Sequence, residues 1–244
     1  MDVIVKGRYR ARLAETATDV ASAQALRHLC FRGGEGRDVD HFDTICKHLL
    51  IEDLQSGDLQ CCFRFLPLAG GDQIDQCYAA QFYELSALRR FAGPMIEMGR
   101  FCIHPAVQDP DILRLAWGAI TRFVDQPGVQ MRFGCSSFHG LEAEAHAEAF
   151  AMLKDGHLAP RRWRPRVKMP EVFRYARVLR ARKPDRARAL LAMPPLLRSY
   201  LAMGGWVSDH AVVDRDLNTL HVFTGLEIGA IPPARVRALR MVAG

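Results

Sequence analysis

The middle of the chain alternates strand-like and helix-like segments, and no other feature of the sequence limits the fold as much. Residues 95–104 are mostly apolar and end before a proline, which predicts a strand. Asp109 and Pro110 then supply an N-cap and a first-turn proline for a helix. A second strand over 129–137 and an Ala-rich helix over 141–153 follow. This order, with short links, predicts an α/β layer fold.

The flanking segments add elements to this pattern without an internal repeat. Apolar residues at helical spacing predict one helix early in the chain, and runs rich in β-forming residues around the turn at 56–58 predict a hairpin. The further elements expected are a helix over 17–31, strands over 49–51 and 59–66, a helix over 193–203, two strands within 206–223, and a short helix opened by Pro232 and Pro233.

Prolines concentrate between residues 160 and 195, where we place the main division of the chain. We expect residues 1–160 to form the core domain. Residues 161–244 are then a basic connector and a small C-terminal extension that packs on the core. A chain of 244 residues is long enough for one large domain of this kind.

The composition is that of a soluble globular protein. No uninterrupted apolar run approaches the roughly 18 residues that a spanning helix needs, and the start lacks the apolar block of a signal peptide. We therefore expect a cytoplasmic protein. The seven cysteines are odd in number and form no Cys-x-x-Cys pair, which predicts packed thiols and no metal site.

The basic character of the chain belongs to one segment. Residues 161–188 contain twelve Arg or Lys against two acidic residues, a net charge of +10, and the remainder has a net charge of −4. Such a segment predicts an acidic partner, although a merely solvated surface is the simpler reading. Only Trp163, Phe173 and Tyr175 interleave there as stacking groups, so a nucleic-acid binder is the least favoured function.

Glu97 and Arg100 lie three residues apart in the otherwise apolar strand over 95–104. A buried carboxylate loses hydration that a partner charge, hydrogen bonds or a raised pKa must offset. The pair is therefore a candidate site, with an ion pair that only joins two strands as the alternative.

A set of charged and aromatic residues recurs in an order that resembles acyl-homoserine-lactone synthases across residues 24–104. The set is an Arg-x-x-x-Phe helix, an Asp-x-x-Asp loop, a strand arginine, a further Phe, and a Glu-x-x-Arg strand, formed here by Arg27, Phe31, Asp40, Asp43, Arg64, Phe82, Glu97 and Arg100. The resemblance implies a GNAT-like acyltransferase fold, with a mixed twisted sheet flanked by helices.

A closer resemblance, over most of residues 8–155, is to the ornithine lipid N-acyltransferases (L-ornithine Nα-acyltransferases). It rests on Glu-x-Gly-Arg-x-x-x-His-Pro from Glu97 and on Phe-Gly-Cys-x-Ser-Phe over 133–138. In that family these strands flank the acyl-donor channel. The resemblance implies transfer of a 3-hydroxyacyl chain to the α-amine of L-ornithine, which makes lyso-ornithine lipid.

The chemistry of acyl transfer to an amino acid gives each candidate residue an expected role. Glu97 accepts the proton of the substrate ammonium, and Arg100 holds Glu97 in position. Backbone N–H groups of the same strand face the thioester oxygen. Asp40 and Asp43 suit the side-chain ammonium of ornithine, and Arg27 or Arg64 suits its carboxylate. The alternative is that these arginines pair with the aspartates and join the first helix and its loop to the sheet.

The aromatic and hydroxyl candidates have weaker assignments. Phe31 and Phe82 either line the acyl tunnel or fill core, and core is the commoner place for a Phe. Ser136 and Ser137 either bond pantetheine amides or cap strand groups. Cys102 and Cys135 lie on the same strands, and we read them as packing residues because no local His and base arrangement would activate them.

The expected acyl donor is acyl carrier protein, and we expect no other cofactor. Ordinary GNAT enzymes hold the coenzyme A pyrophosphate on a Gly-rich turn, whereas the helix here opens with Asp109 and Asp111, which would repel it. The carrier's acidic surface suits the basic segment 161–188, which also suits an anionic membrane.

Two other acyltransferase activities stay open. The Gly-rich link over 32–39 leaves the acceptor undecided between ornithine and glutamine, which would give lyso-glutamine lipid. A signal synthase of the acyl-homoserine-lactone type would need adenosylmethionine. Such synthases carry a Trp in this loop, and none lies between Phe31 and Asp40, so this activity is less favoured.

Overall fold

The computed structural model describes residues 3–125 and 128–243, and the chain divides into two compact units. Unit 1 consists of Met1–Pro67, Met98–Val129 and Pro233–Gly244, and unit 2 consists of Leu68–Glu97 and Gln130–Pro232. Two of the sequence positions at which the chain passes from one unit to the other lie within long strands, β4 (Leu59–Leu68) and β6 (Met95–Ile103).

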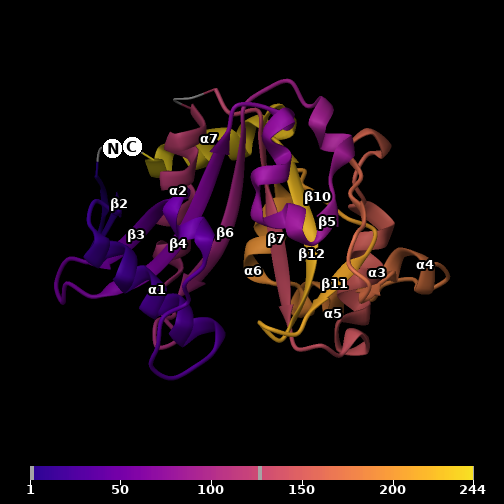
Figure 1. Ribbon diagram of the computed structural model, residues 1–244, viewed down its shortest axis with the longest axis horizontal. Coiled ribbons are helices and arrows are strands. Elements are labelled where there is room, and N and C mark those ends of the chain that lie inside the picture. Colours follow the sequence, from indigo (N-terminus) through magenta and orange to yellow (C-terminus); the bar gives the residue numbers. More distant parts are fainter. Residues whose placement is uncertain (1–2, 126–127, 244) are drawn as a thin grey trace. The chain divides into compact units, whose positions relative to one another are not determined.

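Unit 1 is an antiparallel sheet with helices (Figure 1). Its strands follow the order β1 (Ile4–Lys6), β2 (Tyr9–Leu13), β3 (Lys47–Asp53), β4 and the Met98–Ile103 part of β6. Its helices are α1 (Ala17–Phe31), the 3-10 helix η1 (His41–Thr44), α2 (Pro110–Asp125) and α7 (Pro233–Ala243). Strands β3 and β4 are buried along most of their length, so side chains on both of their faces are covered.

Helix α1 begins at a complete capping box. The Thr16 hydroxyl accepts the Asp19 N–H at 3.1 Å, and the Asp19 carboxylate accepts the Thr16 N–H at 3.1 Å. Ala23 and Leu26 then pack against a cluster on the sheet that includes Leu50. This packing turns the neighbouring Arg27 toward the protein interior, where it is buried.

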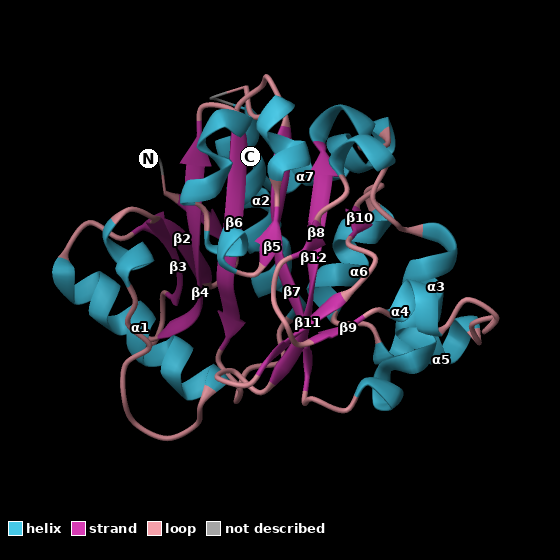
Figure 2. Ribbon diagram, turned by 45° about the vertical axis from the view of Figure 1, so that its right-hand side comes forward, coloured by secondary structure: helices cyan, strands magenta, loops and turns pink. Residues whose placement is uncertain are grey.

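Unit 2 contains further strands of the mixed sheet, joined to one another in antiparallel pairs, together with helices (Figure 2). Its strands follow the order β7 (Met131–His139), β12 (Thr219–Glu227), β11 (Ala211–Asp214) and β9 (Val172–Phe173), and β10 (Trp206–Val207) pairs with β12. A separate pair joins β5 (Tyr83–Glu84) to β8 (Arg166–Val167). The α-helices are α3 (Ala147–Gly156), α4 (Tyr175–Val178), α5 (Arg186–Ala192) and α6 (Pro195–Ala202). The 3-10 helices are η2 (Gly71–Gln76), η3 (Tyr78–Gln81), η4 (Ser86–Arg90), η5 (Ala143–His146), η6 (Arg161–Trp163) and η7 (Ile228–Ala230).

The β7–β12 ladder is the central element of unit 2, because it pairs every residue from Met131 to His139. Phe138 on one face packs with Phe150 of α3 at a ring distance of 4.7 Å. Phe133 on the other face stacks on Phe223 at 5.6 Å. Strand alternation therefore gives this sheet two apolar faces.

Most of the expected elements are confirmed, and the differences lie where local signals are short. The segment 206–223 was expected to hold two strands; it contains β11 and the first part of β12, and also the two-residue strand β10, which was missed. The expected helix over 141–153 begins as the 3-10 helix η5 and is α-helical only from Ala147. The division of the chain at residue 160 stays a prediction.

The seven cysteines are thiols, and Cys61, Cys62, Cys77 and Cys102 are buried, as the packing interpretation expects. In the described ranges, no helix is long and apolar enough to cross a membrane.

Candidate active site

A buried ion pair joins α1 to η1 in unit 1. The guanidinium of Arg27 bonds both carboxylate oxygens of Asp43, at 2.8 and 2.9 Å. It also bonds the backbone carbonyl of Asp38, and its Nε lies 3.0 Å from the Asp38 carboxylate. Since the Arg27 side chain is only 1% exposed, these contacts replace its hydration.

Arg64 on β4 extends this pair into a network. Its two terminal nitrogens bond the two oxygens of Asp40, each at 2.6 Å, and Nη1 also bonds Asp43 at 2.7 Å. Two-pronged contacts of this kind fix orientation as well as charge. The alternative reading of the sequence, in which the arginines pair with the aspartates, is therefore the observed arrangement in unit 1.

Arg100 completes the set from β6. Its Nε donates to Asp38 at 2.9 Å, and Nη2 reaches Asp40 at 3.4 Å. Arg100 has a φ of 54°, in the left-handed region that costs a non-glycine residue about 1–2 kcal/mol. This backbone interrupts the regular alternation of the strand immediately after Gly99.

We call these six residues the aspartate–arginine network: Arg27, Asp38, Asp40, Asp43, Arg64 and Arg100. Sequence reasoning missed Asp38, which is the carboxylate nearest Arg100. Its position in the same polar loop, two residues before Asp40, is the signal that would have found it. Asp40 is the most accessible aspartate, with its side chain 25% exposed against 5% for Asp38 and Asp43.

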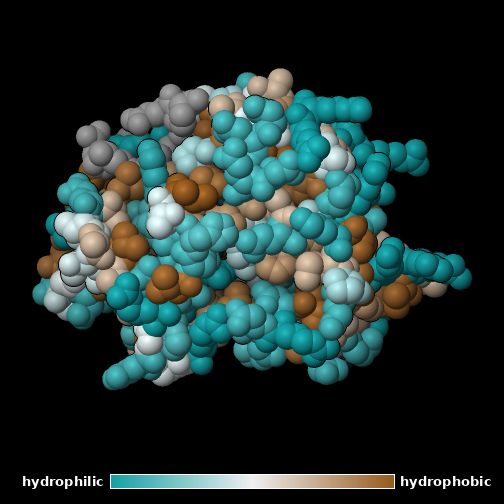
Figure 3. Space-filling model, in the orientation of Figure 1, coloured by the Kyte–Doolittle hydropathy of each residue, from teal (hydrophilic) through white to brown (hydrophobic). Residues whose placement is uncertain are grey.

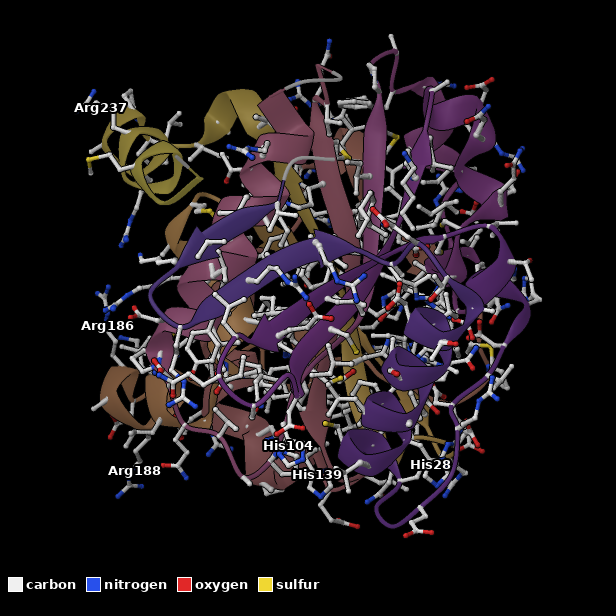
Figure 4. The ribbon with its side chains drawn as sticks, turned by 90° about the vertical axis from the view of Figure 1, so that its left-hand side faces the viewer. His28, His104, His139, Arg186, Arg188 and Arg237 are labelled. Carbon is white, nitrogen blue, oxygen red and sulfur yellow. The ribbon has the colours of Figure 1, made fainter. Side chains whose placement is uncertain are left out.

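The loop between α1 and η1 presents these carboxylates through its own capping. Asp40 accepts the Phe42 N–H at 2.9 Å, and Asp43 accepts the Asp40 N–H at 3.2 Å, which is a capping box around one turn. Gly36 has a φ of 156°, and a Cβ there would collide with the ring of His28, which is labelled in Figure 4. A glycine is therefore needed for the loop to return along α1.

Asp40 and Asp43 are ionised at neutral pH. Burial opposes the charge on Asp43, but the hydrogen bonds and charge of Arg27 hold the pKa of this carboxyl below its usual range. Burial likewise opposes the charge on Asp40, and Arg64 lowers the pKa of that carboxyl. Burial lowers the pKa of His48, whose Nε2 lies 3.1 Å from the Asp43 carbonyl oxygen.

Glu97, in unit 2, is held at the start of η3. Its two carboxylate oxygens accept the N–H groups of Tyr78 and Ala79, each at 2.7 Å, and it is 4% exposed. Burial raises the pKa of the neighbouring Cys77 thiol, and the charge of Glu97 raises it further. Backbone donors at a helix start therefore stabilise the buried Glu97 carboxylate.

The aromatic candidates differ in their surroundings. Phe31, at the end of α1, is partly buried against the same cluster as Leu26, which is a core position in unit 1. Phe82, after η3 in unit 2, is also partly buried, and its ring meets those of Tyr78 at 5.1 Å and His221 at 4.9 Å.

The two serines of β7 point to opposite faces of the sheet. Ser136 is buried, and its hydroxyl accepts that of Thr224 at 2.9 Å. Ser137 is exposed and lies opposite His221 in the ladder. Ser137 is therefore the more accessible of the two for a pantetheine amide.

The start of α2 in unit 1 has its own anion. Asp109 accepts the Asp111 N–H at 2.9 Å and the Tyr9 hydroxyl at 2.9 Å. Hydrogen bonding to the Asp111 N–H and to Tyr9 lowers the pKa of Asp109, so a carboxylate caps this helix start.

Comparisons with known proteins agree with this architecture. A family model described as an acetyltransferase (GNAT) domain matches residues 27–118. The L-ornithine N(alpha)-acyltransferase of Rhodobacter capsulatus is 31% identical over 239 residues, which cover 91% of each chain. The chain belongs to the L-ornithine Nα-acyltransferase family.

A second member of this family, from Rhizobium meliloti, is 30% identical over 238 residues that cover 90% of this chain and 80% of the relative. Among solved structures, FeeM, an N-acyl amino acid synthase from uncultured soil microbes, has a TM-score of 0.54 at 11% identity and covers 92% of this chain and 94% of its own. That likeness shows the shared fold. The GNAT-like fold and the L-ornithine Nα-acyltransferase resemblance are both confirmed, while the roles of the individual residues stay predictions.

The buried position of Asp43 predicts a large effect of its neutralisation. We expect Asp43→Asn to lower the free energy of unfolding by about 3 kcal/mol, because it leaves the buried Arg27 without its two-pronged partner. Urea unfolding followed by circular dichroism measures the change.

The matched control is Asp111→Asn, which removes an exposed pair with Arg114 at 2.8 Å and should cost less than about 0.5 kcal/mol. Equal small losses in the two variants would show that the network does not hold the loop to the sheet.

Proposed function

We propose that this chain transfers an acyl group to the α-amine of L-ornithine. The relatives that share about 30% of its residues over most of its length carry the name L-ornithine N(alpha)-acyltransferase. The observation in unit 1 that carries the proposal is the partly exposed carboxylate of Asp40, because a second amino group is what distinguishes ornithine from most amino acids.

Asp40 has one oxygen suited to that ammonium. Its Oδ1 accepts two short hydrogen bonds, from Arg64 and from the Phe42 N–H. Its Oδ2 accepts one short bond from Arg64 and one long bond, of 3.4 Å, from Arg100. A substrate ammonium at hydrogen-bond distance from Oδ2 would gain a stronger contact than the one it displaces. Glutamine has a neutral amide at this position and gains less.

The arginines suit different tasks. Arg27 and Arg64 are almost completely buried and hold their aspartates through two-pronged contacts, so we assign them to positioning. Arg100 is the most accessible of the three, at 11%, and we assign it to the substrate carboxylate.

Amide formation requires a neutral α-amine and a place for its proton. We assign proton acceptance to Glu97, directly or through one water, since its two backbone contacts fix the carboxylate and a carboxylate has about four sites at which it accepts hydrogen bonds. The amine nitrogen then forms a bond to the thioester carbon, the carbon–sulfur bond breaks, and the leaving thiolate takes the second proton that the amine nitrogen loses. No covalent intermediate on the protein is required.

The proposed acyl donor is a 3-hydroxyacyl chain on acyl carrier protein. Asp109 already caps α2 in unit 1, so the helix start that holds a pyrophosphate in coenzyme A enzymes carries a negative charge instead. The single phosphodiester of phosphopantetheine needs less anion binding than coenzyme A does.

The activity is tested by incubating the protein with 3-hydroxyacyl carrier protein or 3-hydroxyacyl coenzyme A and a panel of amino acids that includes ornithine, lysine and glutamine. Mass spectrometry should find Nα-acylornithine as the main product, formed at least about tenfold faster from the carrier protein. Acylation at the side-chain nitrogen, or preference for glutamine, would contradict the proposal.

The assignment of Glu97 is tested with a matched pair of variants. Glu97→Gln should reduce kcat by about a hundredfold or more, because the amide cannot accept the proton. Glu84→Gln changes a similar capping carboxylate, which accepts the Ser86 N–H at 2.7 Å at the start of η4, and should keep the rate. A full rate in Glu97→Gln between pH 6 and about pH 9 would exclude the base.

The product is a lipid, and one surface of unit 2 suits an anionic membrane. Helices α4 and α5 both pack on α3 and carry the exposed aliphatic residues Val178 (62%), Leu190 (39%) and Leu191 (85%). The same segment of the sequence carries exposed cations: Arg174, Arg177, Arg180, Lys183, Arg186 and Arg188. We call this surface the α4–α5 surface. Figure 3 shows brown atoms beside projecting teal side chains at α4, and in Figure 4 Arg186 and Arg188 extend outward.

Charge pairing differs along the basic segment, and within the α4–α5 surface Arg188 lies 3.6 Å from the Asp185 carboxylate. Arg162 and Arg182 bond Glu227 and Glu148, at 3.0 and 2.8 Å. In the part of the chain that the structure describes, Arg174, Arg177, Arg180, Lys183 and Arg186 form no ion pair. Unpaired cations around exposed aliphatic side chains match a bilayer with anionic headgroups.

Vesicle co-sedimentation tests the α4–α5 surface. We expect binding to phosphatidylglycerol vesicles, little to phosphatidylcholine vesicles, and a loss in 0.5 M salt of about tenfold. Leu191→Ser and Arg186→Glu should each weaken binding by about fivefold to tenfold, whereas Leu54→Ser, at an exposed leucine of unit 1, should not.

Unchanged vesicle binding in both α4–α5 variants would refute the membrane contact. If their KM for acyl carrier protein rises instead, the surface docks the carrier protein.

A further inference from the structure

Unit 2 contains a buried histidine, His221, whose Nε2 has no hydrogen-bond partner among the described residues. His221 lies on β12 and is 2% exposed, and its Nε2 makes no hydrogen bond within the described residues. Leaving a buried polar atom unpaired costs about 1–3 kcal/mol, so such an atom needs an explanation. The mechanism proposed above does not use this residue.

Tyr83 fixes which nitrogen of His221 carries the proton. The Tyr83 hydroxyl lies 2.8 Å from the His221 carbonyl oxygen and 3.1 Å from its Nδ1. A carbonyl oxygen only accepts, so the single hydroxyl proton of Tyr83 points to it. The Nδ1 must then donate to the Tyr83 oxygen, which leaves Nε2 with a bare lone pair.

The His221 ring is neutral at neutral pH. Burial, with a smaller contribution from His210, lowers the pKa of His221 to about 3. Nε2 is therefore a hydrogen-bond acceptor and not a cation.

The surroundings of this acceptor are aromatic. The Phe82 ring meets His221 at 4.9 Å and nearly at a right angle, and Tyr83 meets it at 5.6 Å. The sheet neighbour Phe223 also contacts Tyr83, at 5.7 Å. One fixed acceptor among apolar rings suits a mostly apolar ligand that carries one hydrogen-bond donor.

We propose that His221 Nε2 accepts a hydrogen bond from the hydroxyl group of the acyl chain and so selects hydroxylated acyl donors. The inference rests on the proposed acyl transfer and names one determinant of donor specificity. A site with a buried acceptor rejects a ligand that lacks the donor, because the acceptor then stays unpaired.

An amide N–H of the pantetheine arm is a second possible hydrogen-bond donor to the Nε2 lone pair. The two hydrogen-bond donors predict different effects on the turnover of acyl donors. A hydroxyl contact affects only hydroxylated donors, whereas an amide contact affects every pantetheine-linked donor equally. The ratio of kcat/KM values for 3-hydroxyacyl and plain acyl carrier protein of equal chain length therefore separates them.

We expect the protein to favour the hydroxylated donor by about tenfold to a hundredfold. His221→Phe, which keeps a planar ring, should bring the ratio close to one. His221→Gln restores an acceptor near the position of Nε2 and should recover part of the preference. Tyr83→Phe releases the fixed tautomer and should give an intermediate ratio.

If His221→Phe leaves the ratio of the two kcat/KM values unchanged, the proposal is overturned. This holds both when the two kcat/KM values keep their size and when they fall together. No preference in the unsubstituted protein would overturn it as well. Thermal unfolding of each variant, followed by circular dichroism, identifies any that fail to fold.

Nitrogen NMR of histidine-labelled protein gives a readout that does not depend on turnover. The His221 signals should show an unprotonated Nε2 that shifts on addition of 3-hydroxyacyl pantetheine but not of acyl pantetheine. If the shift occurs and no acylornithine forms, the proposed function fails while the hydroxyl contact stands. If neither compound or both compounds shift the signal equally, the hydroxyl contact is excluded.

Discussion

The arrangement of unit 1 depends on one buried ion pair, between Arg27 of α1 and Asp43 of η1. Each charge would be costly to bury alone, so the helix and the loop must be in place together. Arg64 connects the same carboxylate to β4, and Asp40 and Asp38 connect it to Arg100. The result is a rigid polar framework in which a single partly exposed carboxylate, that of Asp40, is presented for a ligand. The residues that hold the loop to the sheet are therefore also the residues that we assign to substrate binding.

The two charged residues that first mark β6 as unusual have separate surroundings. Arg100 belongs to the aspartate–arginine network of unit 1, and its left-handed backbone is held by contacts to Asp38 and Asp40. Glu97 belongs to unit 2, where two backbone N–H groups at the start of η3 stabilise its charge. A short helix whose start offers two donors needs an acceptor, and this is a reason to bury a carboxylate there. The same contacts fix the direction of a carboxylate that we assign to proton transfer.

The fold class was predictable because strand and helix alternate with clear signals, such as Asp109 before Pro110 and the apolar spacing over residues 17–31. The short strands β1, β2 and β10 were not, since two to five residues carry too little periodicity and depend on their sheet neighbours. In the site, the family resemblance identified the arginines and two of the aspartates, and their pairing was foreseen as an alternative. Asp38 was missed, because it resembles any loop acid until Arg27 and Arg100 are seen beside it. The orphan nitrogen of His221 is likewise visible only in three dimensions, as it follows from the Tyr83 hydroxyl.

The most direct measurement compares ornithine with norvaline, which has the same carbon chain without the side-chain amine, in the unsubstituted protein and in Asp40→Asn. If Asp40 holds the side-chain ammonium, kcat/KM for ornithine exceeds that for norvaline by about a hundredfold, and the substitution removes most of this preference. Equal losses for both amino acids in Asp40→Asn would contradict the account, because Asp40 would then serve only to hold Arg64 and not to recognise the substrate.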